Sequence, residues 1–213
     1  MEAIHSETYS NWGAVQQLHR ICYEIHVRHN KSPDLTSGNL SRVFIEAEEH
    51  RMVGVLMTWS VLTLESMANH ALAEVIEHEI SAINAIEDPK KILKELLPKH
   101  KPGETKTTLK SGLSNKLMIL ADRQSIDREI LKCADWLADR RNNIVHSKPF
   151  KYERYGEDEI ESTRLAKRGD YEYPKYSKLE SFFTACDHVR EFIQSKTMEM
   201  NDVPSFSELL RKS

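Results

Sequence analysis

The chain has 213 residues, enough for one well-cored domain with a terminal arm and too few for two large domains. Charged residues make up 30% of the sequence and aromatic residues 8%, a profile typical of a helix-rich soluble protein. The formal net charge of −3 argues against a general polyanion-binding protein, whose whole surface would be basic.

The cysteines and the apolar segments indicate a cytoplasmic protein. Cys22, Cys133 and Cys186 are far apart and odd in number, so neither a disulfide framework nor a CxxC metal clip is expected. No basic-then-apolar signal sequence opens the chain. The longest nearly apolar run, residues 52–64, is shorter than the roughly 18 to 20 residues that a membrane span needs. We therefore expect no membrane segment.

Apolar residues recur at helical spacing along most of the chain, and no segment shows a convincing strand alternation. After a turn at 30–39, a long apolar segment predicts one very long helix or two collinear ones, with Gly54 as a candidate break or kink. A later helix is expected to be capped by Ser125 and to end close to His146, because Pro149 disfavours helical geometry at the residue before it. In chain order, the expected helices are residues 9–29, 40–86, 89–97, 113–120, 125–146 and 178–200.

These elements predict an all-α bundle of four main helices, with additional short helices and an N-terminal helix. The expected organisation is an N-terminal helix and turn at 1–39, a helical domain at 40–200 and a C-terminal tail at 201–213. Residues 150–177 are polar and irregular, with a possible helical turn at 157–167. The apolar stripe expected on the helix at 125–146 comprises Ile126, Ile130, Cys133, Ala134, Leu137, Ile144 and Val145.

A lysine-rich segment interrupts this pattern. Between Lys90 and Lys116 eight lysines face only two acidic residues, Glu95 and Glu104. Two interpretations stay open at this point: a solvated linker, or a surface that attracts phosphate groups.

The sequence favours neither a metal site nor another cofactor. His70, Glu74 and His78 fall on one helix flank at a spacing that metal ligands can have, but an ordinary polar helix flank has the same pattern. Phosphate-binding loops and nucleophile elbows have no matching motif. Cys133 lies within an apolar stripe, which is typical of a core residue rather than a nucleophile.

The segment RRNNIVHSKP, residues 140–149, places unusually many hydrogen-bonding side chains at one helix end. Asn142 and His146 are four residues apart and therefore share a helix face, and the long side chain of Arg141 can reach back towards them. One interpretation is structural: Arg140 and Arg141 complement the helix dipole while His146 caps carbonyl groups. The other is a site that carries chemistry.

RNNIVH, residues 141–146, resembles the Arg-polar-x-x-x-His signature of the HEPN superfamily, the higher eukaryote and prokaryote nucleotide-binding helical domains. An arginine and a histidine at about this spacing are not diagnostic alone, since Arg20 and His26 also frame five residues. The order of helices over residues 40–200 also resembles that family. The further residues that carry the resemblance are Leu64, Glu65 and Asn69 in the long helix, and Lys116 and Leu117 in the short helix LSNKLMIL.

The resemblance implies a metal-independent endoribonuclease of toxin–antitoxin or antiviral defence systems, with RNA as substrate and an antitoxin protein as a candidate partner. RNA supplies its own nucleophile, the 2′-hydroxyl, so the protein needs a proton acceptor, a cationic clamp and alignment. We expect His146 to act as base or acid, because imidazole has an ordinary pKa of about 6.5. Arg141 presents a planar fork to phosphate oxygens, Asn142 orients His146 or a substrate oxygen, and Glu65 orients Arg141. Since one chain offers one such histidine, a homodimer with facing motifs is expected.

Further residues are expected to contact the substrate, and other functions stay open. Lys148 stands where one branch of the family has a tyrosine that is modified, so that regulation is not expected here. The alternatives are a non-catalytic helical module that binds RNA, nucleotide or a partner protein, and a structural dimer or adaptor. The expected substrate-binding residues are Arg140, Asn69, Lys116 and Lys148.

Overall fold

The computed structural model describes residues 2–31, 40–82, 112–121, 126–145, 174–197 and 202–211. Within these ranges all regular structure is helical and no strand occurs, which confirms the predicted all-α class. The helices expected at 89–97 and near 157–167 lie outside the described residues. The elements are α1 (Glu2–Lys31), α2 (Leu40–Ala82), α4 (Leu113–Leu120), α5 (Arg128–Val145), the 3₁₀ turn η2 (Tyr176–Lys178), α6 (Leu179–Gln194) and α7 (Ser207–Arg211).

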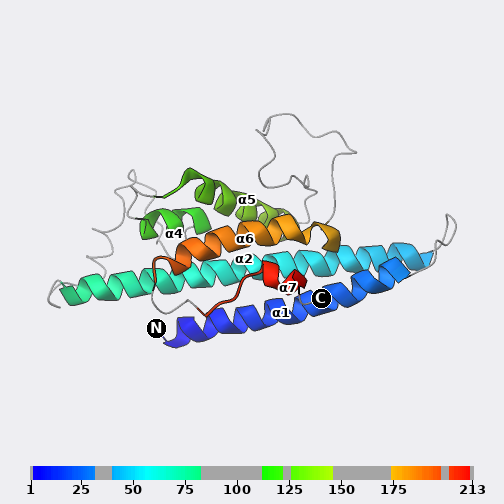
Figure 1. The fold of residues 1–213 in the computed structure, drawn as a ribbon, viewed down its shortest axis with the longest axis horizontal. Helices are drawn as coiled ribbons and strands as arrows, with labels where there is room; N and C mark the ends of the chain where they lie inside the picture. Colours follow the sequence, from blue (N-terminus) through cyan, green and yellow to red (C-terminus); the bar gives the residue numbers. More distant parts are fainter. Residues whose placement is uncertain are drawn as a thin grey trace.

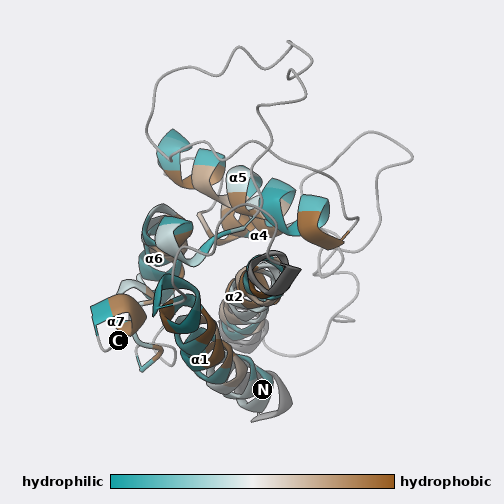
Figure 2. Ribbon diagram, turned by 90° about the vertical axis from the view of Figure 1, so that its right-hand side faces the viewer, coloured by the Kyte–Doolittle hydropathy of each residue, from teal (hydrophilic) through white to brown (hydrophobic). Residues whose placement is uncertain are grey.

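The long helix α2 is the centre of the fold. It is one continuous helix, and α1, α4, α5 and α6 all pack against it, so its apolar residues are buried around most of its circumference. Figure 1 shows α1 and α2 running side by side in opposite directions, with α6 and then α5 stacked over α2. The view along the long helices in Figure 2 shows the same layers, with α7 beside α1 and α6.

Gly54 does not break α2 but allows a close approach. A Cβ atom at this position would lie 3.2 Å from Cγ2 of Ile144 in α5 and 3.8 Å from Cγ of Pro174. The absence of a side chain therefore lets the last turn of α5 and the segment leading into η2 rest on the α2 backbone.

The core follows the helical periodicity of the sequence, with one exception. The inner faces expected on α1 and α6, including Trp12 and Phe182, are buried, and the three cysteines are buried and form no disulfide. Val145 was expected on the apolar stripe of α5, but it is 60% exposed. The prediction was wrong because Ile144, its neighbour, already faces α2, and adjacent helical residues point about 100° apart.

Three helix boundaries differ from the prediction. α1 begins at Glu2, well before residue 9. Asp127 rather than Ser125 caps α5. Its carboxylate accepts a hydrogen bond from the backbone N–H of Glu129 at 2.9 Å, and its backbone carbonyl accepts hydrogen bonds from backbone N–H groups of the first helical turn. α6 ends at Gln194 rather than near residue 200.

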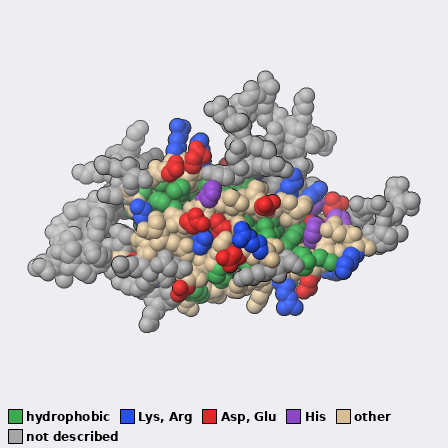
Figure 3. Space-filling model, in the orientation of Figure 1, with side chains coloured by type: hydrophobic (Ala, Val, Ile, Leu, Met, Phe, Trp, Pro, Cys, Tyr) green, Lys and Arg blue, Asp and Glu red, His purple; other side chains and the backbone are tan. Residues whose placement is uncertain are grey.

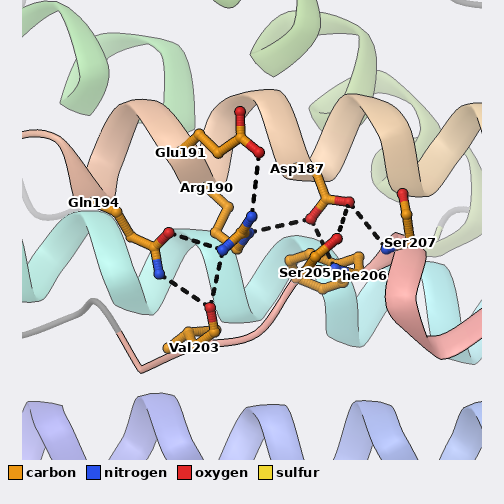
Figure 4. Close-up of polar contacts among 8 residues, drawn as sticks. All are labelled: Asp187, Arg190, Glu191, Gln194, Val203, Ser205, Phe206 and Ser207. Carbon is orange, nitrogen blue, oxygen red and sulfur yellow. Dashed lines mark hydrogen bonds and ion pairs between the residues drawn. The ribbon is translucent and has the colours of Figure 1, made fainter.

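The segment expected as a C-terminal tail packs against α1 and α6. Asp187 accepts hydrogen bonds from the Ser205 hydroxyl (2.7 Å) and from the backbone N–H groups of Phe206 (2.7 Å) and Ser207 (2.9 Å), as Figure 4 shows. Arg190 and Gln194 both donate to the carbonyl of Val203 at 3.0 Å. These bonds turn the chain back along the bundle, which explains why α6 does not continue.

Aromatic packing completes this attachment. The ring of Phe206 is buried and meets Trp12 of α1 edge-on at 4.9 Å between centroids, with Phe183 of α6 at 6.0 Å. Among the helices described, none is both long enough and apolar enough to cross a membrane.

Candidate functional site

The last turn of α5 is joined to the middle of α2 by an ion pair. Nη1 of Arg141 donates to Oε1 of Glu65 at 2.8 Å, and Nη2 donates to Oδ1 of Asn142 at 3.2 Å. The side chains of Arg141 and Glu65 are 24% and 19% exposed, so the pair is partly shielded from water. The guanidinium is therefore held in one orientation while its other N–H groups stay available to a ligand.

A second cation, Lys116, interacts electrostatically with this pair. Lys116 is only 3% exposed, because α4 presents it to the bundle together with its leucines. Burial lowers the pKa of the Lys116 ammonium; the charge of Glu65 raises this pKa and that of Arg141 lowers it again. The three charged groups of α2, α4 and α5 thus act on one another, with one net positive charge.

Asn69 adds a polar atom that has no partner among the described residues. It lies one helical turn after Glu65 on α2 and so on the same flank. Its Oδ1 atom is buried, and no described residue donates a hydrogen bond to it. A buried acceptor without a protein donor is uncommon in proteins.

The structure separates Arg140 from Arg141. Arg140 is buried, and its guanidinium carbon lies 5.1 Å from the centre of the Trp136 ring, a cation–π contact within α5. His146 and Lys148, the other two expected site residues of this segment, lie outside the described residues. The expected set therefore divides into a described cluster of Glu65, Asn69, Lys116, Arg141 and Asn142, an Arg140 that faces Trp136, and two residues without a described position.

The other patterns of the sequence do not assemble into a second site of the same kind. His70 is fully buried and Glu74 accepts a hydrogen bond from Thr197, whereas His78 lies outside the described residues. In the described part of the chain, no three His, Cys, Asp or Glu side chains are grouped as a metal ion would require. Of the lysine-rich segment, the only lysine in the described residues is Lys116, so the role of the others stays open.

Arg20 and His26 have separate partners. Nε of Arg20 donates to Glu24 at 3.2 Å on the surface of α1. His26 instead contacts Glu49 at 3.3 Å. This arginine and histidine therefore do not form a common site.

Sequence analysis missed a cluster centred on the buried Glu49. Its carboxylate contacts Nδ1 of His26 and, at 2.9 Å, Nδ1 of His29, and it accepts the backbone N–H of Tyr176 at 3.0 Å. Burial alone would raise the pKa of Glu49, but the bonds from Tyr176 and the two histidines outweigh it and lower the pKa. Figure 3 shows histidine side chains gathered where α1 ends and α2 begins. The sequence signal was Glu49 itself, which is in helical phase with the apolar Val53.

Comparisons of the chain with protein-family models, with curated proteins and with solved structures find no match.

Proposed function

We propose that this protein is a metal-independent endoribonuclease of the HEPN type, in which His146 and Arg141 act on an RNA phosphate beside the attacking 2′-hydroxyl. The observation that carries the proposal is the fixed guanidinium of Arg141, held by Glu65 and Asn142 and placed near the buried ammonium of Lys116. Cations that are oriented before the substrate arrives stabilise the charge that develops on a phosphorane. Because RNA brings its own nucleophile, this chemistry needs no metal-bound water.

The neighbouring groups fit supporting roles. Glu65 orients the guanidinium of Arg141, and Asn142, the next residue of α5, accepts a hydrogen bond from the same guanidinium. The buried Oδ1 of Asn69 accepts a hydrogen bond from a ribose hydroxyl or a base amino group, which would supply the donor that the described residues do not.

The test is cleavage of single-stranded RNA in EDTA by the purified protein. RNA should be cut to a 2′,3′-cyclic or 3′ phosphate and a 5′-hydroxyl, while DNA of the same sequence survives because it lacks the 2′-hydroxyl. His146→Ala should lower the rate by about 10²- to 10⁴-fold, the usual contribution of a proton-transfer group. Arg141→Ala should lose about 10²- to 10³-fold, the usual value of one oriented donor to the transition-state charge.

Arg20→Ala is the matched control for Arg141→Ala. Arg20 makes one ion pair, with Glu24, and its side chain is 82% exposed, so its loss should leave cleavage unchanged. His26→Ala is not a suitable control because His26 contacts the buried Glu49. Cleavage that requires a divalent metal ion, or that His146→Ala leaves at the parent rate, would refute the ribonuclease proposal.

Two further statements belong to the same proposal. A second copy of the chain is the expected partner, and the exposed Val145 within the motif is an apolar side chain that such a partner would cover. Sedimentation of the parent and of Val145→Glu measures the oligomeric state. The parent should sediment as a dimer, and the variant should dissociate into monomers. The defence role, with an antitoxin as possible partner, predicts that induced expression of the parent arrests growth whereas His146→Ala does not.

A second candidate function is RNA or nucleotide binding without cleavage. It is favoured by the partial burial of the Arg141–Glu65 pair, which suits a structural ion pair as well as a clamp. In that case the parent binds RNA, Arg141→Ala weakens the binding, and no product forms at any protein concentration.

A further inference from the structure

The chain enters α6 through a short segment, residues 174–178, which we call the strap. One residue of the strap, Tyr176, attaches it to α1 and α2. The backbone N–H of Tyr176 donates to Oε1 of the buried Glu49 at 3.0 Å, and its hydroxyl is hydrogen-bonded to Nε2 of His19 at 2.8 Å. Its ring stacks on that of His26, with the two centroids 4.8 Å apart. Backbone, hydroxyl and ring are all held, so the strap is fixed at this residue.

The groups that receive Tyr176 are themselves fixed by other contacts. Glu49 is 3% exposed, and its carboxylate also contacts Nδ1 of His26 at 3.3 Å and Nδ1 of His29 at 2.9 Å. Nε2 of His26 contacts the side-chain amide of Asn30 at 2.9 Å, so both ring nitrogens of this histidine have partners. Side chains that are bonded on several sides keep one orientation, so α1 and α2 offer a preformed attachment to the strap.

The other end of the strap meets the last turn of α5. A Cβ atom at Gly54 of α2 would lie 3.8 Å from Cγ of Pro174 and 3.2 Å from Cγ2 of Ile144, so both side chains rest on the same point of the α2 backbone. Pro174 is buried there. Ile144 follows Arg141 by three residues and so lies on the same side of α5. This end of α5 is therefore held against α2 at two places, at Gly54 and through the ion pair of Arg141 with Glu65.

These two places lie on one face of α2. Gly54 and Glu65 are eleven residues apart, which is close to three turns of about 3.6 residues each. The last carbonyl groups of a helix have no intrahelical partners, so packing decides how firmly the final turn is fixed. The contact of Ile144 at Gly54 therefore sets the position from which the side chain of Arg141 reaches Glu65.

We propose that Tyr176 is a positioning residue of the candidate site: it anchors the strap, and the strap holds the last turn of α5 so that the guanidinium of Arg141 keeps its place. The effect on RNA cleavage rests on the proposed ribonuclease function, whereas the effect on the helix end is a property of the fold. A displacement of about 1 Å in a group that aligns a substrate costs about 10²-fold in rate, so a residue that does not touch the substrate can control the reaction.

The first measurement needs no RNA. In protein with isotope-labelled isoleucine methyl groups, Ile144→Val identifies the NMR signal of Ile144 by its disappearance. Tyr176→Ala should shift this signal and speed amide hydrogen exchange over residues 142–145, because the strap loses its attachment. Tyr176→Phe keeps the ring and the backbone N–H and should restore most of the parent behaviour. The control is Ser205→Ala, which weakens the attachment of residues 202–211 instead and should leave the Ile144 signal in place.

Pro174→Ala tests the same link from the other end of the strap, and it decides the question alone where Tyr176→Ala does not fold. This variant leaves all three contacts of Tyr176 and removes the ring that lies on Gly54, so the Ile144 signal should shift again. A signal that stays at its parent position in either folded variant would overturn the proposal.

RNA cleavage then distinguishes positioning from a general loss of stability. Tyr176→Ala should lower kcat and kcat/KM by the same factor, about 10²-fold. In a protein that already carries Arg141→Ala it should lower neither further, because Tyr176 acts through that arginine. Losses that multiply in the double variant would show that Tyr176 acts elsewhere, against the proposal. A parent that cleaves no RNA refutes the ribonuclease proposal alone, since the Ile144 signal still reports whether the strap positions α5.

Discussion

Replacement of Asp187 by alanine tests whether one buried carboxylate attaches the C-terminal segment to the bundle. The carboxylate accepts the Ser205 hydroxyl at 2.7 Å, the N–H groups of Phe206 (2.7 Å) and Ser207 (2.9 Å), and Nε of Arg190 at 3.1 Å. Both Asp187 and Arg190 are buried, so their bonds are poorly replaced by water.

The expected loss in the free energy of unfolding depends on the polar groups that lose their partner when Asp187 is replaced. A hydrogen bond to a charged group contributes about 1.5 to 3 kcal/mol, and several bonds to one carboxylate are not additive. Removing one partner of a buried ion pair costs about 3 to 5 kcal/mol. Arg190 keeps its bonds to Gln194 (2.8 Å) and to the Val203 carbonyl (3.0 Å), which limits the penalty. We therefore expect Asp187→Ala to lower the free energy of unfolding by about 3 to 5 kcal/mol.

Urea unfolding at neutral pH measures this free energy, and amide hydrogen exchange at Phe206 and Ser207 reports whether the segment detaches. Ser205→Ala removes only one of the bonds, so a loss of about 1 to 2 kcal/mol is expected from it. A loss below about 1 kcal/mol for Asp187→Ala, the size of an ordinary surface substitution, would refute this reasoning.

The same carboxylate gives the stability a pH dependence. Burial alone would raise the pKa of Asp187, but its bonds to Ser205, Ser207 and Phe206 outweigh this and lower the pKa below the ordinary 3.8. A group whose pKa is lower in the folded state stabilises the protein above its unfolded pKa, and this stability is lost as pH falls through the folded pKa. Unfolding free energies measured from neutral pH to below 3.8 should therefore decrease less steeply in Asp187→Asn than in the parent.

Three further predictions follow from single contacts. Gly13→Ala, where nothing lies within 4 Å of the new Cβ, should raise the free energy of unfolding by about 1 kcal/mol. Gly54→Ala, whose Cβ would lie 3.2 Å from an α5 side chain, should leave the free energy of unfolding unchanged or lower it. An equal gain in stability at both sites would refute the close packing at Gly54. Glu49→Gln removes the charge that two histidines contact and should cost about 2 to 3 kcal/mol in urea unfolding, whereas an unchanged value would mean the cluster is only incidental. Glu65→Gln weakens the ion pair that orients Arg141, so RNA cleavage should slow, and an unchanged rate would separate Glu65 from the site.

Helix positions and the core were predictable because they depend on spacing alone. The inner faces of α1, α2 and α6 carry apolar residues at helical spacing, interrupted by a few buried polar residues such as Glu49 and Asp187. Burying the apolar residues decides which face of each helix points inward. The ends were less predictable because they depend on distant groups. α6 ends where Arg190 and Gln194 bind the carbonyl of Val203, and the local sequence of the helix does not predict that contact.

The site was predictable to a smaller extent. The motif indicated Arg141 and Asn142, and the resemblance suggested Glu65, but the pairing of α5 with α2 is a matter of tertiary structure. The sequence also contained a more general signal, which is a charged residue at a helix position where the spacing of the apolar residues would place another apolar residue. Glu49, Lys116 and Asp187 all have this property, and all three are centres of buried electrostatic interactions.

The attachment of residues 202–211 has a consequence for the order in which the chain folds during synthesis. α1 and α2 are neighbours in sequence and can pack as soon as both have been made, since contacts between adjacent segments form quickly. The aromatic surface of Trp12 and Phe183, by contrast, is completed by Phe206, which follows both residues in the sequence and lies far from Trp12 along the chain. A nascent chain therefore carries an uncovered apolar surface until residues 202–211 have left the ribosome. Protein that stops short of these residues keeps that surface exposed and is expected to aggregate or be degraded.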